Sequence, residues 1–266
     1  MLKIIVLAKQ VPDTHNVGPE AMTPEGTVNR AALPTVFNPE DLNALEQALR
    51  LKEQHPGSTI TMLTMGLPKA ADVLREGVYR GADDGILLTD RALGGADTLA
   101  TSYSLAQAIR KIGNYDIILC GRQAIDGDTA QVGPQIAEHL DLPQVSYMED
   151  LKYDEATKTF TIRKQLEDGY QLLEMQAPCV VTALASAVKP RYMTVGGIVT
   201  AWDKEVEVWG ADRINVPEDR IGKTGSPTSV FKAFPKQLKP AGETFEVAPE
   251  EAVELIVNKL KEKHII

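Results

Sequence analysis

The stretch "DIILCGRQAIDGDTAQVGPQIAEHLDL", residues 116–142, joins three patterns that together indicate the fold. Its first part, "DIILCG", is a short apolar run rich in Ile and Leu, as in a strand buried on both faces. Its last part, "PQIAEHLDL", spaces apolar residues as an amphipathic helix does. The thirteen residues "GRQAIDGDTAQVG" (121–133) lie between them, where a strand-to-helix connection usually takes about 2 to 6. The loop is longer than its topology requires, which favours a functional role.

The same alternation of strand and helix extends in both directions. Short apolar runs bounded by turn residues are "KIIVLAK" (3–9), "STITMLTMG" (58–66), "DGILLTD" (84–90) and "PCVVTAL" (178–184). Helical patterns are "NPEDLNALEQALRLKEQ" (38–54), "PKAADVLREGVYRGA" (68–82), "ADTLATSYSLAQAIRKIG" (96–113) and "DTAQVGPQIAEHLDL" (128–142). In the first of these, Asn38 is expected at the N-cap and Pro39 at the first helical position. The sequence therefore predicts an α/β fold, Rossmann-like, with a mostly parallel sheet flanked by helices.

Two regions depart from this alternation. Residues 150–176 show short alternating segments joined by the turn-rich "DEAT" and "EDG", which predict an antiparallel hairpin. From about residue 186 the chain has little periodicity until "APEEAVELIVNKLKEKH" (248–264), which predicts an amphipathic helix. We expect an α/β domain over 1–225, which includes the hairpin and a functional segment at 188–202, and a C-terminal extension over 226–266.

Charge and hydropathy exclude several classes of partner. The 266-residue chain has a net charge of -9 and no run of Lys and Arg, so nucleic acid and anionic membrane surfaces are not its expected partners. No apolar stretch approaches the roughly 20 residues of a membrane span, and "IIVLA" is too short for a signal-peptide core. We therefore expect no membrane insertion and a cytoplasmic location.

The cysteines and histidines indicate neither redox nor metal chemistry. Cys120 and Cys179 lie at or within expected strands without C-x-x-C spacing, which favours buried core thiols. The histidines have no ligand spacing and occur at His15, His55, His139 and His264. We predict no metal site.

Three loops are candidates for ligand binding, because open α/β sheets bind ligands beyond the carboxyl ends of their strands. "NPED" (38–41) and "GGADT" (94–98) also fit plain helix capping, an interaction of about 1 kcal/mol. In the 121–133 loop, Gly127 and Gly133 would let a ligand approach the backbone. Arg122 could offer its cation to a phosphate or a flavin ring edge.

The acidic residues of the 121–133 loop indicate a sugar as well as a phosphate. Asp126 and Asp128 would repel a phosphate, so they are expected to cap N–H groups or to bind ribose-type hydroxyls. Asp128 or Thr129 could cap the following helix. The chain has neither G-x-x-x-x-G-K-[ST] nor G-x-G-x-x-G after its first strand, and no nucleophile with an evident base. We expect no catalytic side chain, and a bound nucleotide cofactor that carries the chemistry.

At these residues the sequence resembles the beta (small) subunit of electron-transfer flavoproteins, nearly end to end. The matching stretches are "VLAKQVPD" (6–13), "NPED", the 121–133 loop, "IRKQLEDGYQLLEMQAPCVVTA" (162–183) and "KPRYMTVGGI" (189–198). The resemblance implies an adenine-nucleotide-binding subunit that pairs with a larger alpha subunit, on which the C-terminal extension packs. It also implies electron delivery to an acyl-CoA dehydrogenase or enoyl-CoA reductase.

The family has two branches, which differ in the nucleotide of this subunit. In the ordinary branch the subunit holds structural AMP. In the electron-bifurcating branch it holds FAD, which accepts a hydride from NADH. One electron then goes to ferredoxin or flavodoxin and the other to the alpha-subunit FAD. "DRALGGADTLATS" (90–102) and the 121–133 loop resemble the bifurcating branch, so FAD is favoured. A different class, an ATP-binding regulatory module, would not explain the 188–202 segment or the C-terminal extension.

The resemblance also implies which residues bind the nucleotide. Its adenine and ribose are expected at Leu7, Ala8, Asn38, Pro39, Glu40, Asp41 and Met65, although strand-end packing also explains Leu7 and Met65. Its pyrophosphate is expected along Arg122, Gln123, Ala124, Ile125, Asp126, Gly127, Asp128, Thr129, Ala130, Gln131, Val132 and Gly133. The ribityl chain and isoalloxazine are expected at Gly94, Gly95, Asp97 and Thr98.

"KPRYMTVGGIVTAW" (189–202) corresponds to the family's recognition loop. The resemblance implies that an apolar anchor here enters a pocket of the acceptor dehydrogenase. Val195 lies at the anchor position and Met193 could share its role, with Arg191 and Tyr192 beside them. Two alternatives remain: Arg191 could hold the loop from within, and the whole loop could simply fold onto its own domain.

Overall fold

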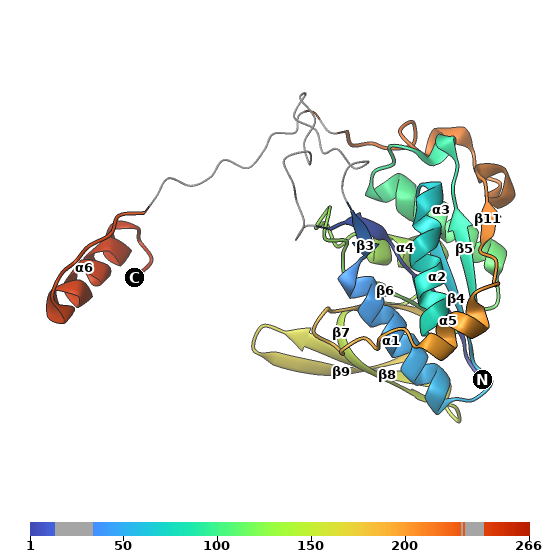
Figure 1. The fold of residues 1–266 in the computed structure, drawn as a ribbon, viewed down its shortest axis with the longest axis horizontal. Coiled ribbons are helices and arrows are strands. Elements are labelled where there is room, and N and C mark those ends of the chain that lie inside the picture. Colours follow the sequence, from blue (N-terminus) through green and yellow to red (C-terminus); the bar gives the residue numbers. More distant parts are fainter. Residues whose placement is uncertain (14–33, 230, 232–241) are drawn as a thin grey trace. The chain divides into compact units, whose positions relative to one another are not determined.

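The computed structural model describes residues 1–13, 34–229, 231 and 242–266 (Figure 1). The chain divides into two compact units, Met1–Lys232 and Ala233–Ile266. The first unit contains the sheet and the helices that flank it. The second contains one described helix, α6 (Pro249–Glu262), which confirms the amphipathic helix expected there.

Over the described residues, one sheet has nine strands in the order β11-β5-β4-β1-β6-β10-β7-β8-β9. Its parallel strands from β11 to β7 are β11 (Glu207–Trp209), β5 (Asp84–Leu88), β4 (Thr59–Met65), β1 (Lys3–Leu7), β6 (Ile117–Gly121), β10 (Cys179–Ala183) and β7 (Gln144–Asp154). β8 (Thr159–Leu166) and β9 (Gly169–Gln176) add to it antiparallel. A separate antiparallel pair consists of β2 (Gln10–Pro12) and β3 (Thr35–Phe37). The predicted fold class is confirmed.

Helices cover both faces of the parallel part of the sheet (Figure 1). The helices of the first unit are α1 (Pro39–Gln54), α2 (Ala71–Arg80), α3 (Thr98–Ile112), α4 (Val132–Leu140) and α5 (Val195–Ala201). Short 3-10 turns are η2 (Pro68–Ala70), η3 (Arg91–Leu93), η4 (Ala211–Ile214) and η5 (Glu218–Arg220).

Alternate residues of each central strand enter different cores. In β1, Ile4 and Val6 pack in one cluster with α1 and α2, whereas Ile5 and Leu7 pack in another with α3 and α4. This alternation follows from the two-residue period of a strand. Because both faces are covered, the strand is apolar throughout, and that is why its short run was readable in the sequence.

The antiparallel excursion is larger than the expected hairpin over 150–176. β7 already begins at Gln144 and pairs in parallel with β10 before it pairs antiparallel with β8. β7, β8 and β9 form two successive hairpins that extend the main sheet. Their outer residues are largely exposed, so their apolar pattern is weaker than that of a buried strand.

The region after residue 186 is also more regular than its sequence suggests. It contains the helix α5 and the edge strand β11, which pairs in parallel with β5. The expectation of an irregular region is therefore wrong for these residues. A seven-residue helix and a three-residue strand are too short to show a period, so the neighbouring elements determine their structure.

The second unit is described by α6 and the residues around it. Lys259 in α6 pairs with Glu243 at 3.1 Å. Part of the expected 226–266 extension, residues 230 and 232–241, lies outside the described residues. None of the helices in the described ranges is both long and apolar enough to span a membrane.

Candidate nucleotide site

The candidate site lies at the carboxyl ends of β1 and β6. β1 pairs with β4 on one side and with β6 on the other. The chain leaves β1 toward β4 and β5 and later returns to place β6 on the opposite side. The strand order reverses at this point, and α/β sheets bind ligands beyond the strand ends at such a reversal. The 121–133 loop follows β6, the 94–98 loop comes after β5 and η3, and residues 38–41 follow β3 at the start of α1.

Polar side chains at the start of α1 hold the first half of the 121–133 loop. The Asn38 amide donates to Gln123 O at 2.9 Å and accepts from Ile125 N at 3.2 Å. Glu40 accepts from Gln123 N and from Arg122 Nη2, both at 2.9 Å. Asn38 occupies the N-cap position of α1, but its side chain makes no cap hydrogen bond. "NPED" therefore fixes a neighbouring loop instead of simply capping its own helix.

Asp41 links α1 to the ends of both central strands. Its carboxylate accepts from Gly121 N at 2.8 Å and from Lys9 N at 2.9 Å. Burial raises the pKa of Asp41 to about 7, although the hydrogen bonds from Gly121, Asn38 and Lys9 oppose the shift. The contacts at the end of β6 therefore depend on a carboxyl group that changes protonation near neutral pH.

The positive charge of Arg122 is already matched within the chain. Its guanidinium pairs with Glu40 at 2.9 Å and lies 5.6 Å from the ring centroid of Tyr147. Its Nε is buried and finds no acceptor among the described residues. Arg122 thus retains one buried donor for a ligand, but it does not supply an unmatched cation.

The two aspartates of the loop contact neighbouring side chains. Asp126 pairs with Lys9 Nζ at 2.6 Å, and Asp128 accepts from Gln123 Nε2 at 2.9 Å. The prediction that Asp128 or Thr129 caps the following helix is wrong, because α4 begins at Val132 and its N-cap position is Gln131. Left-handed backbone at Asp128 (φ 51°) and Ala130 (φ 52°) redirects the chain before the helix starts.

The second half of the loop presents free backbone donors. Within the described ranges, no group accepts a hydrogen bond from the amides of Thr129, Ala130, Gln131, Val132 or Gly133. A left-handed alanine costs about 1 to 2 kcal/mol, and strained backbone of this kind concentrates at ligand sites. Unpaired amides at a helix start attract anions through their dipoles. The segment fits the phosphate groups of a nucleotide.

Gly127 and Gly133 of the loop have different surroundings. A Cβ at Gly133 would lie 2.8 Å from Thr182 Cγ2 and 2.9 Å from Cys120 Sγ, so this glycine lets α4 pack closely against β6 and β10. A Cβ at Gly127 would meet nothing within 4 Å. Packing explains Gly133, whereas Gly127 borders open space that a ligand could occupy.

The 94–98 loop joins the same site. Asp97 caps α3 by accepting from the amides of Leu99 and Ala100, both at 3.0 Å. The Thr98 hydroxyl donates to Gln131 Oε1 at 2.9 Å, which connects this loop to the free amides at the start of α4. The 94–98 and 121–133 loops therefore form one continuous edge.

The 221–228 segment, "IGKTGSPT", also supports this edge, a role that the sequence analysis missed. Lys223 N donates to Gly94 O at 3.0 Å, and Ser226 Oγ accepts from Asp97 N at 2.8 Å. Asp97 accepts in turn from Thr228 N at 3.1 Å and Thr228 Oγ1 at 2.7 Å. These contacts span about 130 residues of sequence, so no local pattern reveals them. The close grouping of Gly, Ser and Thr was the only available signal.

The remaining expected contacts lie at strand and helix ends. The side chain of Leu7 is buried in the core beside α3, and Met65 packs against the same cluster. Ala8 N donates to Leu63 O at 3.0 Å, and Pro39 is the first residue of α1. Strand-end packing therefore accounts for the side chains of Leu7 and Met65.

Cys120 and Cys179 are both buried, as expected for core thiols. Burial raises the pKa of Cys120, and the nearby carboxylates of Asp41 and Glu40 raise it further. The described residues contain no cluster of three or more His, Cys, Asp or Glu side chains that could hold a metal ion.

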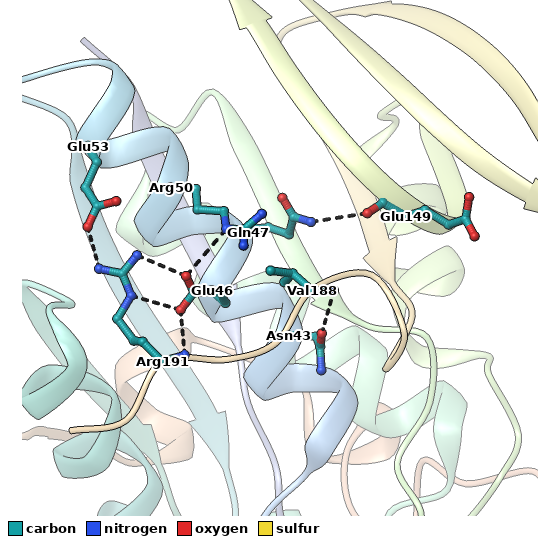
Figure 2. Close-up of polar contacts among 8 residues, drawn as sticks. All are labelled: Asn43, Glu46, Gln47, Arg50, Glu53, Glu149, Val188 and Arg191. Carbon is teal, nitrogen blue, oxygen red and sulfur yellow. Dashed lines mark hydrogen bonds and ion pairs between the residues drawn. The ribbon is translucent and has the colours of Figure 1, made fainter.

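The 188–202 segment lies apart from these loops, against α1 (Figure 2). Tyr192 and Val195 are 80% and 79% exposed, and Met193 is 40% exposed. Arg191 differs from these neighbours, because its guanidinium points to α1 and pairs with Glu46 and Glu53. The segment combines an exposed apolar part with an internal ionic attachment.

Comparison with known proteins gives consistent matches. A family model described as "Electron transfer flavoprotein domain" matches residues 25–213. The chain is 49% identical to the electron transfer flavoprotein subunit beta of Clostridium acetobutylicum. It is 46% identical both to the caffeyl-CoA reductase-Etf complex subunit CarD of Acetobacterium woodii and to the acryloyl-CoA reductase electron transfer subunit gamma of Anaerotignum propionicum. Each match covers 100% of this chain and 100% of the relative.

Proposed function

This chain belongs to the electron transfer flavoprotein family as a beta subunit, and we propose that it is of the bifurcating kind, with FAD as its nucleotide. NADH is the proposed electron donor. The proposed acceptors are ferredoxin or flavodoxin and, through the alpha-subunit FAD, an acyl-CoA dehydrogenase or enoyl-CoA reductase. A bound flavin supplies both hydride and single-electron chemistry. The work of this chain is to bind and orient the nucleotide and to dock its partners.

The observation that carries the proposal is the run of amides from Thr129 to Gly133, which find no acceptor among the described residues and lie on a loop that α1 holds in place. A diphosphate needs several donors in a fixed arrangement, and these amides supply them without a side-chain rearrangement. Because Arg122 and Lys9 are already paired with Glu40 and Asp126, the amides and the dipole of α4 would carry most of the phosphate binding.

The 94–98 loop supports FAD over AMP. It is joined to the phosphate-binding amides through Thr98 and Gln131. At Gly94 and Gly95 no side chain projects from the loop. A nucleotide that continues past its phosphates along this edge would meet glycine backbone, whose Cβ positions face Arg91 O at 3.1 Å and Lys223 Cβ at 3.4 Å. AMP ends at its phosphate and would make no use of this edge.

The names of two relatives support the partner class. One is a subunit of a caffeyl-CoA reductase complex and the other is an electron transfer subunit of acryloyl-CoA reductase. Both names specify reduction of a CoA thioester. An enoyl-CoA reductase is therefore the proposed partner that docks on the exposed apolar part of the 188–202 segment.

The nucleotide content of the purified alpha–beta heterodimer tests the proposal. Nucleotides released by denaturation are separated and counted per heterodimer, before and after incubation with added FAD or AMP. The proposal predicts two FAD and no AMP. One FAD and one AMP, with the AMP not displaced by FAD, would place the chain in the ordinary branch. Binding of ATP by this subunit alone would favour a regulatory module.

A further inference from the structure

One buried carboxylate on α1 holds the 188–202 segment. Glu46 accepts from Arg191 Nε at 2.9 Å and from Arg191 Nη2 at 3.0 Å, a two-point contact that fixes the plane of the guanidinium. It also accepts from Arg191 N at 3.0 Å (Figure 2). Both the side chain and the backbone of Arg191 are therefore attached to one residue of α1.

Further contacts hold the chain on either side of Arg191. Asn43, one turn before Glu46, accepts from Val188 N at 3.1 Å, and Glu53 pairs with Arg191 Nη1 (Figure 2). From the other direction, Arg80 of α2 donates to the carbonyl of Arg191. The backbone is thus fixed between α1 and α2 just before it becomes exposed.

Beyond this attachment the chain displays largely exposed apolar side chains, one of which, Trp202, stacks on Tyr79 of α2. Tyr192, Val195, Val199 and Trp202 are 80%, 79%, 70% and 67% exposed. Three of them follow within α5 or at its end. α5 lies close to the end of α2, since a Cβ at Gly197 would be 2.4 Å from the carbonyl oxygen of Tyr79. α5 is therefore packed against α2, and residues 192–194 connect it to the attachment at Arg191.

The ion pair between Glu46 and Arg191 is favourable although Glu46 is buried. Burial alone would raise the pKa of Glu46, but the hydrogen bonds and charge of Arg191 outweigh burial and lower it. Each guanidinium nitrogen of Arg191 already donates to Glu46 or Glu53. If Arg191 turned away from α1 to bind another protein, it would give up its two-point contact with a buried carboxylate, which is costly.

We propose that Arg191 is a positioning residue, attached to Glu46, that holds residues 192–202 in the conformation that docks the redox partner. It does not itself contact the partner. The identity of the partner rests on the proposed function above, whereas the internal attachment does not. The contacts of Arg191 make the docking conformation available before the partner arrives, so that docking does not have to order the segment.

Four variants of the heterodimer separate positioning from direct contact. Arg191→Gln removes the guanidinium. Glu46→Gln keeps Arg191 but removes the charge that holds it, so a direct contact would survive and a positioning role would not. Arg191→Lys keeps the charge without the two-point geometry, and serves if a stronger change prevents folding. Arg50→Gln is the matched control, because Arg50 also pairs with Glu46, at 3.5 Å, but lies outside the segment.

Amide hydrogen exchange on the heterodimer, with no redox partner present, tests the attachment itself. We expect exchange in residues 192–201 to be about tenfold faster in Arg191→Gln and in Glu46→Gln, because the segment opens locally more often. Arg191→Lys is expected to be intermediate and Arg50→Gln unchanged. Wild-type exchange in both Arg191→Gln and Glu46→Gln would overturn the proposal.

Electron transfer to a purified acyl-CoA dehydrogenase then tests the role in docking. In Glu46→Gln and Arg191→Gln we expect the KM for the dehydrogenase to rise several-fold, while kcat and nucleotide content stay normal. A raised KM in Arg191→Gln with a normal KM in Glu46→Gln would identify Arg191 as a direct contact and overturn the proposal. A wild-type heterodimer that transfers no electrons would contradict the proposed function, while hydrogen exchange would still decide the attachment.

Discussion

Two segments of this chain, the 121–133 loop and the 188–202 segment, are held by the same helix in different ways. The start of α1 holds the loop through Asn38, Glu40 and Asp41, which bind mainly backbone amides. The middle of α1 holds the second segment through Glu46, which binds one arginine. The loop is attached at several successive residues, whereas the segment is attached mainly at one.

The two attachments shift the pKa of their buried carboxyl groups in opposite directions. Burial raises the pKa of Asp41, because its amide donors and the charge of Lys9 only partly compensate. The pKa of Glu46 is lowered despite burial, because Arg191 provides a full positive charge. Contacts at the nucleotide site are therefore expected to respond to pH near neutrality, and those of the docking segment are not.

The two segments also present different chemistry to a partner molecule. The loop presents amides from Thr129 to Gly133 that have no acceptor in the described part of the chain, and such amides suit an anion. The 188–202 segment presents exposed apolar side chains such as Tyr192 and Val195, which suit a protein surface. One helix thus supports both the candidate nucleotide site and the segment proposed to dock a partner.

The largest expected effect comes from Gly121, where α1 approaches β6 most closely. A Cβ there would lie 2.6 Å from Asp41 Oδ1 and 2.7 Å from Asp41 N. We expect Gly121→Ala to lower the free energy of unfolding by about 3 kcal/mol, measured by urea denaturation of the heterodimer.

Gly127→Val is the matched control for Gly121→Ala. A Cβ at this position meets nothing within 4 Å, so we expect a stability change within about 0.5 kcal/mol together with loss of the beta-subunit nucleotide. Gly95→Val is a poorer test, because Gly95 has a left-handed backbone (φ 72°). If Gly121→Ala were as stable as wild type, that result would contradict the close packing of α1 against Gly121.

Asp41 gives the next largest effect, as a dependence of stability on pH. The folded chain keeps the Asp41 proton up to about pH 7, whereas the ordinary pKa is 3.8. The protonated carboxyl of Asp41 therefore stabilises the folded state. Its contribution to the free energy of unfolding is fully present below pH 3.8 and is lost as the pH rises through about 7.

Asp41→Asn cannot titrate, so it isolates that contribution. We expect the stability advantage of wild type over Asp41→Asn to shrink by about 3 kcal/mol between pH 5 and pH 8. Denaturation curves at several pH values provide the measurement, with Glu46→Gln as the comparison. An advantage that stays constant or grows with pH would show that the Asp41 carboxyl is ionised throughout.

The smallest effect on stability is expected at the exposed anchor. Val195 is 79% exposed, so Val195→Ala should change the free energy of unfolding by less than about 0.5 kcal/mol. If Val195 is the docking anchor, the same variant should slow re-oxidation by the dehydrogenase several-fold and leave flavin reduction by NADH unchanged. Stopped-flow traces of both reactions that match wild type would remove Val195 from the docking surface.

The sequence predicts the centre of this fold well and its margins poorly. β1, β4, β6 and β10 are buried on both faces, so their apolar runs are diagnostic. β11 has three residues and α5 has seven, too few to show a period. The start of β7 at Gln144 could not be predicted either, because it depends on pairing with β10.

At the candidate site, the sequence located the loops but not the direction of their side chains. "NPED" and the 121–133 loop were both singled out, yet nothing local shows that Glu40 binds Arg122, 82 residues away. The same holds for Glu46 and Arg191, which are 145 residues apart. Long-range ion pairs and hydrogen bonds depend on how the elements pack, so the internal contacts of Glu40, Asp41 and Arg191 could not be read from a local pattern.

Amide hydrogen exchange on heterodimers with Glu40→Gln or Glu46→Gln tests most directly whether one helix holds two segments independently. Glu40→Gln is expected to speed exchange within residues 122–131 and to leave residues 192–201 at the wild-type rate. Glu46→Gln is expected to do the reverse. If either variant loosened both segments equally, or loosened only the segment assigned to the other, α1 would not support the two sites separately and the account would be contradicted.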